Sequence, residues 1–246
     1  MNLVTEILYE SFVFGITAAI TATFLAPLQF MKIIRQETLD NYRDIARDSF
    51  SRGKFKIFFR GAVPYAVLQF VSSAAFGVSN FTSGIILEHS ESFLAAVLVR
   101  SLLGGALETA ATISTEVREI SRNKGELMQS KGRASSIVLP IWIRNSIFWF
   151  ASALSFEIYK RTHITSSQSA ALAFLLGVVA GVLSIPPDLL ATQSCGAAKD
   201  IGIMARFRGL MQINGIDKAF AGAKIRIIQI ALFSLVTECV MTAMNK

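Results

Sequence analysis

Residues 164–191 read ITSSQSAALAFLLGVVAGVLSIPPDLLA, and no charged side chain occurs in them before Asp188. Two more stretches of similar length have no charged residue at all, Ser11–Met31 and Ala62–Leu87. About 20 consecutive apolar residues are enough to cross the hydrocarbon core of a bilayer as an α-helix. Each of the three stretches is therefore predicted to be a transmembrane helix.

Three further apolar stretches contain only one or two charged residues each. They are Ser92–Thr115 with Arg100 and Glu108, Ser135–Phe156 with Arg144, and Ile227–Met244 with Glu238. The chain is 52% hydrophobic and 17% charged, whereas an average soluble domain is roughly 25% charged. A soluble protein would have to be very large to bury six such helices. The sequence therefore predicts an all-α membrane protein with six transmembrane helices.

Most basic residues lie in the three connections that follow the first, third and fifth predicted spans. They are Arg35, Arg43, Arg47, Arg52, Lys54, Lys56, Arg60, Arg118, Arg122, Lys124, Lys131, Arg133, Lys199, Arg206, Arg208, Lys218, Lys224 and Arg226. The positive-inside rule places these connections in one inner compartment, and an even number of spans puts both termini on the opposite side. Membrane topology and anionic lipid account for the net charge of +7, so we expect no nucleic-acid partner.

The connections differ in pattern. Asn41–Phe50 and Lys199–Met211 mix apolar and charged residues at roughly helical spacing. Both are predicted to form short amphipathic helices at the membrane surface. Residues 123–136 are more polar, and we expect a loop there.

Related motifs recur around the spans. Residues 26–32, APLQFMK, and residues 185–191, IPPDLLA, both place a proline at the inner end of a span. Residues 58–61, FFRG, and residues 218–222, KAFAG, both precede the next span. The motifs predict three repeats of two spans each. Their boundaries are residues 1–88, 89–163 and 164–246.

Small residues also recur, at nearly equal distances before the inner ends of the odd-numbered spans. Gly15 and Gly104 have Ala19 and Glu108 four positions later, and Gly177 has Gly181. Small residues four apart let helices approach closely in lipid. We therefore expect these positions to lie in helix–helix contacts.

With these features the sequence resembles the mitochondrial carrier family. The odd-numbered helices of that family end in Pro-x-[Asp/Glu]-x-x-[Lys/Arg], and its even-numbered helices begin after an aromatic-[Lys/Arg]-Gly element. The resemblance covers the whole chain and implies three helix pairs around a central cavity. It also implies a monomer without a cofactor in the mitochondrial inner membrane, with both termini on the cytoplasmic (intermembrane-space) side and surface helices on the matrix side.

The resemblance implies a matrix gate of ion pairs between the repeats. Position by position, Gln29 would face Glu119, Glu116 would face Ala191, and Asp188 would face Lys32 with Gln36 beneath it. Two of the three pairs lack the family's complementary charges. We expect a gate formed by Lys32, Asp188, Gln36 and Glu116, with the alternative that Lys32 only snorkels to the headgroups.

The family's cytoplasmic gate, [Phe/Tyr]-[Asp/Glu]-x-x-[Lys/Arg], is matched once, at Phe156-Glu157-Ile158-Tyr159-Lys160. We expect Glu157 and Lys160 to serve there. The alternative is a local contact between residues three apart on one helix. Arg100 is expected near the outer mouth of the cavity.

Arg144 lies well inside a predicted span, where an ionisable residue suggests a functional site. Its spacing before Phe156 matches the substrate-contact position of the resembling family, and a guanidinium suits carboxylates. The implied substrate site consists of Arg144, Asn145, Gln229, Arg226 and Gln69. The alternative is that Arg144 pairs with Glu108 as a structural contact.

The resemblance also implies membrane-lipid binding, with cardiolipin phosphates at the helix starts after Gly61 and Gly222. Helix N-termini favour such anions. The alternative, that these glycines only turn the chain, is compatible with lipid binding.

The motifs together favour exchange of a small anionic metabolite, a carboxylate or keto acid, by alternating access. A nucleotide or phosphate carrier and a non-transporting adaptor or insertion factor are the alternatives. Cys195, Cys239, His89 and His163 form no metal or disulfide pattern. The sequence contains no nucleophile triad or phosphate loop in a plausible context, so we expect no enzyme.

Overall fold

The computed structural model describes residues 3–86, 92–125, 134–162, 165–195 and 202–244, which form helices and no strand. The long helices are α1 (Leu3–Thr38), α3 (Ala62–Ile86), α4 (Phe93–Lys124), α5 (Ala134–Arg161), α6 (Ser166–Leu183) and α10 (Ala223–Met244). The shorter ones are α2 (Tyr42–Gly53), η1 (Lys54–Phe59), α7 (Ile185–Ser194), α8 (Ile203–Asn214) and α9 (Ile216–Ala219).

Several of these helices are long and apolar enough to cross a membrane. In the described part of the chain the number is four, or five when the bent pair α6 and α7 counts as one span. The four are found within α1, α4 and α5 and across η1 and α3. This arrangement fits a multi-pass membrane protein. The sixth predicted span lies within α10, which is one continuous helix but is not among these five.

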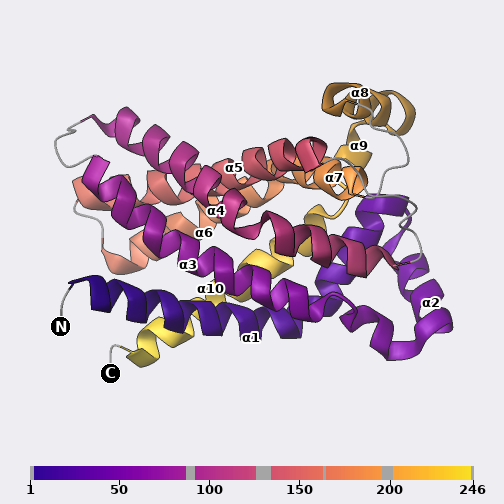
Figure 1. Cartoon of the computed structure of the whole chain (residues 1–246), viewed down its shortest axis with the longest axis horizontal. Helices are drawn as coiled ribbons and strands as arrows, with labels where there is room; N and C mark the ends of the chain where they lie inside the picture. The colour runs from indigo at the N-terminus through magenta and orange to yellow at the C-terminus, as the bar shows by residue number, and fades with distance from the viewer. Residues whose placement is uncertain (1–2, 87–91, 126–133, 163–164, 196–201, 245–246) are drawn as a thin grey trace.

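The long helices pack in a closed order. Helix α1 packs against α3, α3 against α4, α4 against α5, and α5 against both α6 and α7. Helix α10 packs against α6 and returns to α1. Figure 1 shows both chain termini at one end of this bundle and α2, α8 and α9 at the other. We call these the terminal end and the connection end.

Two consecutive prolines break the fifth predicted span. Pro186 and Pro187 lie in the first turn of α7, where a proline costs no hydrogen bond because that turn has no intrahelical acceptor for its N–H groups. Helices α6 and α7 therefore meet at Ser184 at 44°. Single prolines at Pro27 and Pro140 lie inside α1 and α5 without ending them.

Glycines lie at the contact between the two long helices of each predicted repeat. A Cβ atom on Gly15 would overlap Phe70, one on Gly104 would overlap Trp149, and one on Gly181 would overlap Ile230. The absent side chain therefore lets α1 approach α3, α4 approach α5, and α6 approach α10. The glycines fall near the positions at which the sequence pattern predicts close contacts.

The two predicted surface helices correspond to α2 and α8. Ile45 of α2 packs against Phe30 and Ile34 of α1, and Leu210 of α8 packs against Leu189 and Leu190 of α7. Each of these two helices thus packs at the connection end, α2 on α1 and α8 on α7.

The loop prediction for residues 123–136 is wrong at both ends. Asn123 and Lys124 belong to α4, and residues 134–136 belong to α5. Lys124 is buried because its ammonium binds groups of two other helices, described below. Residues 126–133 lie outside the described part of the chain.

Candidate functional site

A cavity of about 330 Å³ lies between the long helices, and each of them contributes to its wall. Helices α1, α4, α5 and α7 contribute charged side chains to its lining. The polar and charged lining residues are Gln29, Lys32, Gln69, Ser72, Glu108, Glu116, Glu119, Arg144, Asn145, Ser152, Asp188, Thr192, Arg226 and Gln229. All five residues of the predicted substrate site are therefore in this wall.

Most charged groups lie at the connection-end side of the cavity. On α1 and α4 higher residue numbers lie nearer that end, and Lys32, Glu116 and Glu119 are the later lining residues there. On α5 and α10 lower numbers lie nearer that end, and Arg144 and Arg226 are the first lining residues there. The uncharged residues Ser72, Ser152 and Phe233 line the part nearer the terminal end.

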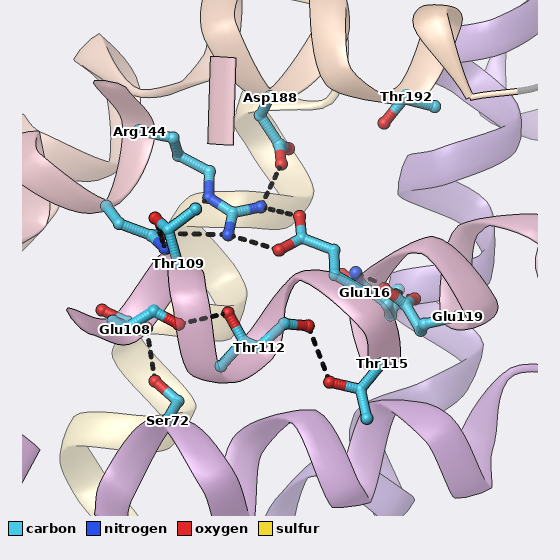
Figure 2. A network of polar contacts seen from close by, with 12 residues as sticks. Ser72, Glu108, Thr109, Thr112, Thr115, Glu116, Glu119, Arg144, Asp188 and Thr192 are labelled. Carbon is cyan, nitrogen blue, oxygen red and sulfur yellow. Dashed lines mark hydrogen bonds and ion pairs between the residues drawn. The ribbon is translucent and has the colours of Figure 1, made fainter. Parts of the chain in front are cut away.

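Arg144 occupies the centre of this charged region. Figure 2 shows its guanidinium pointing between the carboxylates of Glu116 and Asp188. Nη2 donates to Glu116 Oε2 at 2.8 Å, and Nη1 contacts Glu116 Oε1 and lies 3.1 Å from Asp188 Oδ1. Nε and Nη2 also donate to Asn145 Oδ1, at 3.1 and 2.8 Å. The guanidinium is thus held by the planar, two-pronged contacts that suit arginine.

Asp188 connects α7 to α1. Lys32 Nζ lies 2.8 Å from Asp188 Oδ2, and the side-chain amide of Gln36 donates to the same oxygen at 2.9 Å. The hydroxyl of Thr192 donates to Gln36 Oε1 at 3.0 Å. The structure thus brings together the predicted group of Lys32, Asp188 and Gln36. Lys32 is 2% exposed and points inward, so the alternative that it snorkels to the headgroups is wrong.

A second contact joins α1 to α4. Gln29 Nε2 donates to Glu119 Oε1 at 3.1 Å, as the position-by-position comparison predicts. Asn123 Nδ2 donates to the same carboxylate oxygen at 2.8 Å. Gln229 of α10 donates to Gln29 Oε1 at 3.1 Å and extends this contact across the cavity. These groups are uncharged apart from Glu119, so hydrogen bonds replace an ion pair here.

The third predicted position, Glu116 opposite Ala191, has no basic residue on α7 to complete it. Arg144 supplies that charge from α5 instead. Sequence reasoning missed this pairing because it assigned Arg144 to the substrate. The signal was present, since an acid without its expected base and an arginine without a partner occurred in neighbouring spans.

Lys124 forms a further layer nearer the connection end. Its Nζ lies 2.8 Å from Glu37 Oε2 of α1 and donates to the carbonyl oxygens of Thr192 and Cys195 at 3.1 and 2.6 Å. These carbonyls belong to the C-terminal turn of α7, where a helix has carbonyls without intrahelical partners. Lys124 thus ties the ends of α1, α4 and α7 together. A loop prediction at this position gave no indication of it.

Glu108 has a different environment from the other acids. The hydroxyl of Ser72 donates to Oε1 and the indole N–H of Trp149 donates to Oε2 at 2.8 Å. The expected alternative in which Arg144 pairs with Glu108 is wrong, because Arg144 is turned toward Glu116 and Asp188.

Arg226 lies on the α10 side of the cavity. Its guanidinium carbon lies 4.8 Å from the centre of the Phe148 ring, in a cation–π contact. Among the described residues its Nε has no hydrogen-bond partner, and neither has Oε1 of the neighbouring Gln229. Both groups line the cavity.

A smaller charged group lies toward the terminal end. Glu157 binds Arg161 Nε at 3.1 Å and lies 3.6 Å from Arg100 Nε of α4. Arg100 also lies over the ring of Phe156, at 4.7 Å. The alternative of a local contact between Glu157 and Lys160 is wrong, because Glu157 points into the bundle whereas Lys160 lies on the exposed face of α5. The gate role of the two residues stays a prediction.

Gly61 and Gly222, the predicted lipid sites, lie in close contacts. A Cβ atom on Gly61 would overlap the side chain of Asn123. Gly222 has φ of +98° and faces Lys32, so both its backbone conformation and its surroundings favour glycine. The turning role expected as the alternative is therefore present at Gly222. Lipid binding at either position stays a prediction.

No group of His, Cys, Asp and Glu that could hold a metal ion occurs among the described residues. No protein-family model and no curated protein matches the chain.

Proposed function

We propose that this chain is a solute transporter of the mitochondrial carrier type. It would have six spans in three repeats and would move a small carboxylate-bearing metabolite by alternating access. The observation that carries this proposal is the cavity lined by charged groups whose connection-end side is closed by contacts between helices of different predicted repeats.

The closing contacts have the chemistry that a reversible gate requires. Lys32–Asp188, Arg144–Asp188 and Gln29–Glu119 are side-chain contacts between helices of different predicted repeats. Arg144 also binds Glu116 of the preceding helix, α4. In a buried ion pair the cost of desolvation offsets most of the attraction, so the net stabilisation is small. Solvation of the separated groups by water entering an open cavity would therefore compensate for breaking these contacts.

Location and topology follow from the resemblance and from the charge pattern. We propose the mitochondrial inner membrane, both termini on the cytoplasmic side, and the connection end in the matrix. In that orientation the present structure is closed to the matrix. Cardiolipin at Gly61 and Gly222 belongs to the same proposal.

The experiment is counter-exchange in proteoliposomes loaded with keto acids, dicarboxylates, phosphate, amino acids or nucleotides. Saturable exchange of one carboxylate class is the expected result. The Arg226→Gln variant should weaken it, because Arg226 is a cavity cation outside the closing contacts. Arg208→Gln on the exposed face of α8 is the matched control and should exchange normally.

Absence of exchange by a folded, correctly inserted protein would contradict the proposal. It would favour the adaptor or insertion-factor alternative. Exchange of phosphate or nucleotides alone would support the transport function but contradict the proposed substrate class.

A further inference from the structure

The cavity wall has more acidic than basic side chains. Among the described lining residues the acids are Glu108, Glu116, Glu119 and Asp188, and the bases are Lys32, Arg144 and Arg226. A substrate with several negative charges and no positive one would add to an existing excess of negative charge. The wall therefore fits a substrate that brings a positive charge of its own.

Most of these charges already have partners within the closing contacts. Asp188 binds both Lys32 and Arg144, and Arg144 also binds Glu116. Glu119 accepts hydrogen bonds from the amides of two neighbouring residues, Gln29 and Asn123. These groups close the connection-end side and offer little to a solute while they do so.

Two charges remain outside the closing contacts. The carboxylate of Glu108 accepts from the neutral donors Ser72 and Trp149, and no lysine or arginine of the described chain has a described ion pair with it. Arg226 has the Phe148 ring beside it and no carboxylate within that distance among the same residues. The wall thus holds one acid and one base that are positioned by neutral groups and that have no opposite charge in contact.

The two charges contact adjacent residues of α5. Glu108 is bound by Trp149, and Arg226 lies over Phe148. Glu108 comes from α4 and Arg226 from α10, so they reach these two residues of α5 from different helices. Oε1 of Gln229, on the α10 side, is a buried acceptor that has no hydrogen-bond partner among the described residues.

We propose that the transported solute is a small zwitterion of the amino-acid class, with its carboxylate at Arg226 and its ammonium group at Glu108. This inference rests on the proposed transport function. The ammonium group would meet a carboxylate whose two oxygens are held in place by Ser72 and Trp149. The carboxylate would bind the guanidinium of Arg226, which lines the cavity.

The test compares neutral amino acids with the keto acids of the same carbon skeleton, which lack only the ammonium group. Competition for exchange in proteoliposomes and thermal stabilisation of the purified protein are both measured. The wild type should prefer the amino acid in both assays. Glu108→Gln keeps the side-chain shape and removes the charge. The apparent affinity for the amino acid should therefore fall by about tenfold or more, whereas the apparent affinity for the keto acid should stay the same or rise.

Asp44→Asn is the matched control, because it also neutralises a carboxylate, but on the exposed face of α2 and outside the cavity. It should retain the preference for amino acids. Equal use of both solutes by the wild type, or an equal loss of both in Glu108→Gln, overturns the inference. Exchange of keto acids alone overturns it and leaves the transport proposal intact, whereas selective stabilisation by amino acids without exchange keeps the zwitterion site and refutes transport.

Discussion

Arg144 allows two carboxylates to be buried side by side at the closed end of the cavity. Glu116 is 2% exposed and Asp188 4% exposed. Asp188 also has Lys32, but the described ion pair of Glu116 is with Arg144. An ionised carboxylate is costly to bury without a partner. Loss of the guanidinium should therefore destabilise the protein mainly by leaving the Glu116 carboxylate unpaired.

Arg144→Gln is therefore expected to destabilise the protein by about 3 kcal/mol, the low end of the cost of breaking a buried ion pair. The measurement is thermal unfolding in detergent. Glu116→Gln in the same chain removes the unpaired charge, so the double variant should recover much of the lost stability. A single variant as stable as the wild type, or a double variant no better than the single one, would show that the pair does not hold this region.

At the level of the helices, Lys124 of α4 holds the C-terminal turn of α7 in place. The ammonium group binds two carbonyls of that turn and also Glu37 of α1. A buried carbonyl that loses its donor costs about 1–3 kcal/mol. The closed arrangement of the connection end should therefore weaken without Lys124.

Lys124→Met should make Cys195 more reactive, since this thiol is 0% exposed in the present structure and its carbonyl is one of the oxygens that Lys124 binds. The measurement is the rate of maleimide labelling in a Cys239→Ala background. Lys160→Met, at an exposed position near the terminal end of α5, is the control and should label as slowly as the parent. Equal rates in all three proteins would mean that Lys124 does not keep this end closed.

Close contacts between paired helices depend on their glycines. A methyl group at Gly104 would displace the indole of Trp149, which also donates to Glu108. Gly104→Ala is expected to lower stability by about 1–3 kcal/mol because the contact is overpacked. Thermal unfolding measures the effect.

Gly209 provides a comparison, because nothing lies within 4 Å of the position of an added Cβ atom there. Gly209→Ala should leave stability unchanged or raise it slightly, since alanine favours the helix. If both substitutions had the same effect, the packing explanation at Gly104 would be wrong.

Over the whole molecule, the long helices form a closed ring around the cavity, because α10 packs against both α6 and α1. The return of α10 to α1 places the two termini at one end in Figure 1. If α10 crosses the membrane, the number of spans is even and the termini share a side. If it does not, they lie on opposite sides.

We expect tags at the two termini to be accessible from the same side of sealed vesicles. In a background without Cys195 and Cys239, Lys160→Cys should react with an impermeant maleimide from that side. Arg47→Cys on the exposed face of α2 should react only after permeabilisation or from the other side. Termini on opposite sides would refute the six-span arrangement.

The sequence by itself determined the long helices, since a charge-free stretch has few ways to satisfy its backbone in a bilayer other than as a helix. The spans around Ser11–Met31 and Ala62–Leu87 and the surface helices α2 and α8 were predictable from apolar length and amphipathic pattern. The contacts of Lys32 with Asp188 and of Gln29 with Glu119 followed from aligned motifs.

Only the tertiary structure decided the partners of Arg144, Lys124 and Glu157. A long side chain can reach groups on several helices. Which group it contacts depends on the rotation of each helix about its own axis and on its position along that axis. Spacing along one helix gives neither quantity. The sequence did not show for the same reason that Glu108 and Arg226 contact adjacent residues of a third helix, α5.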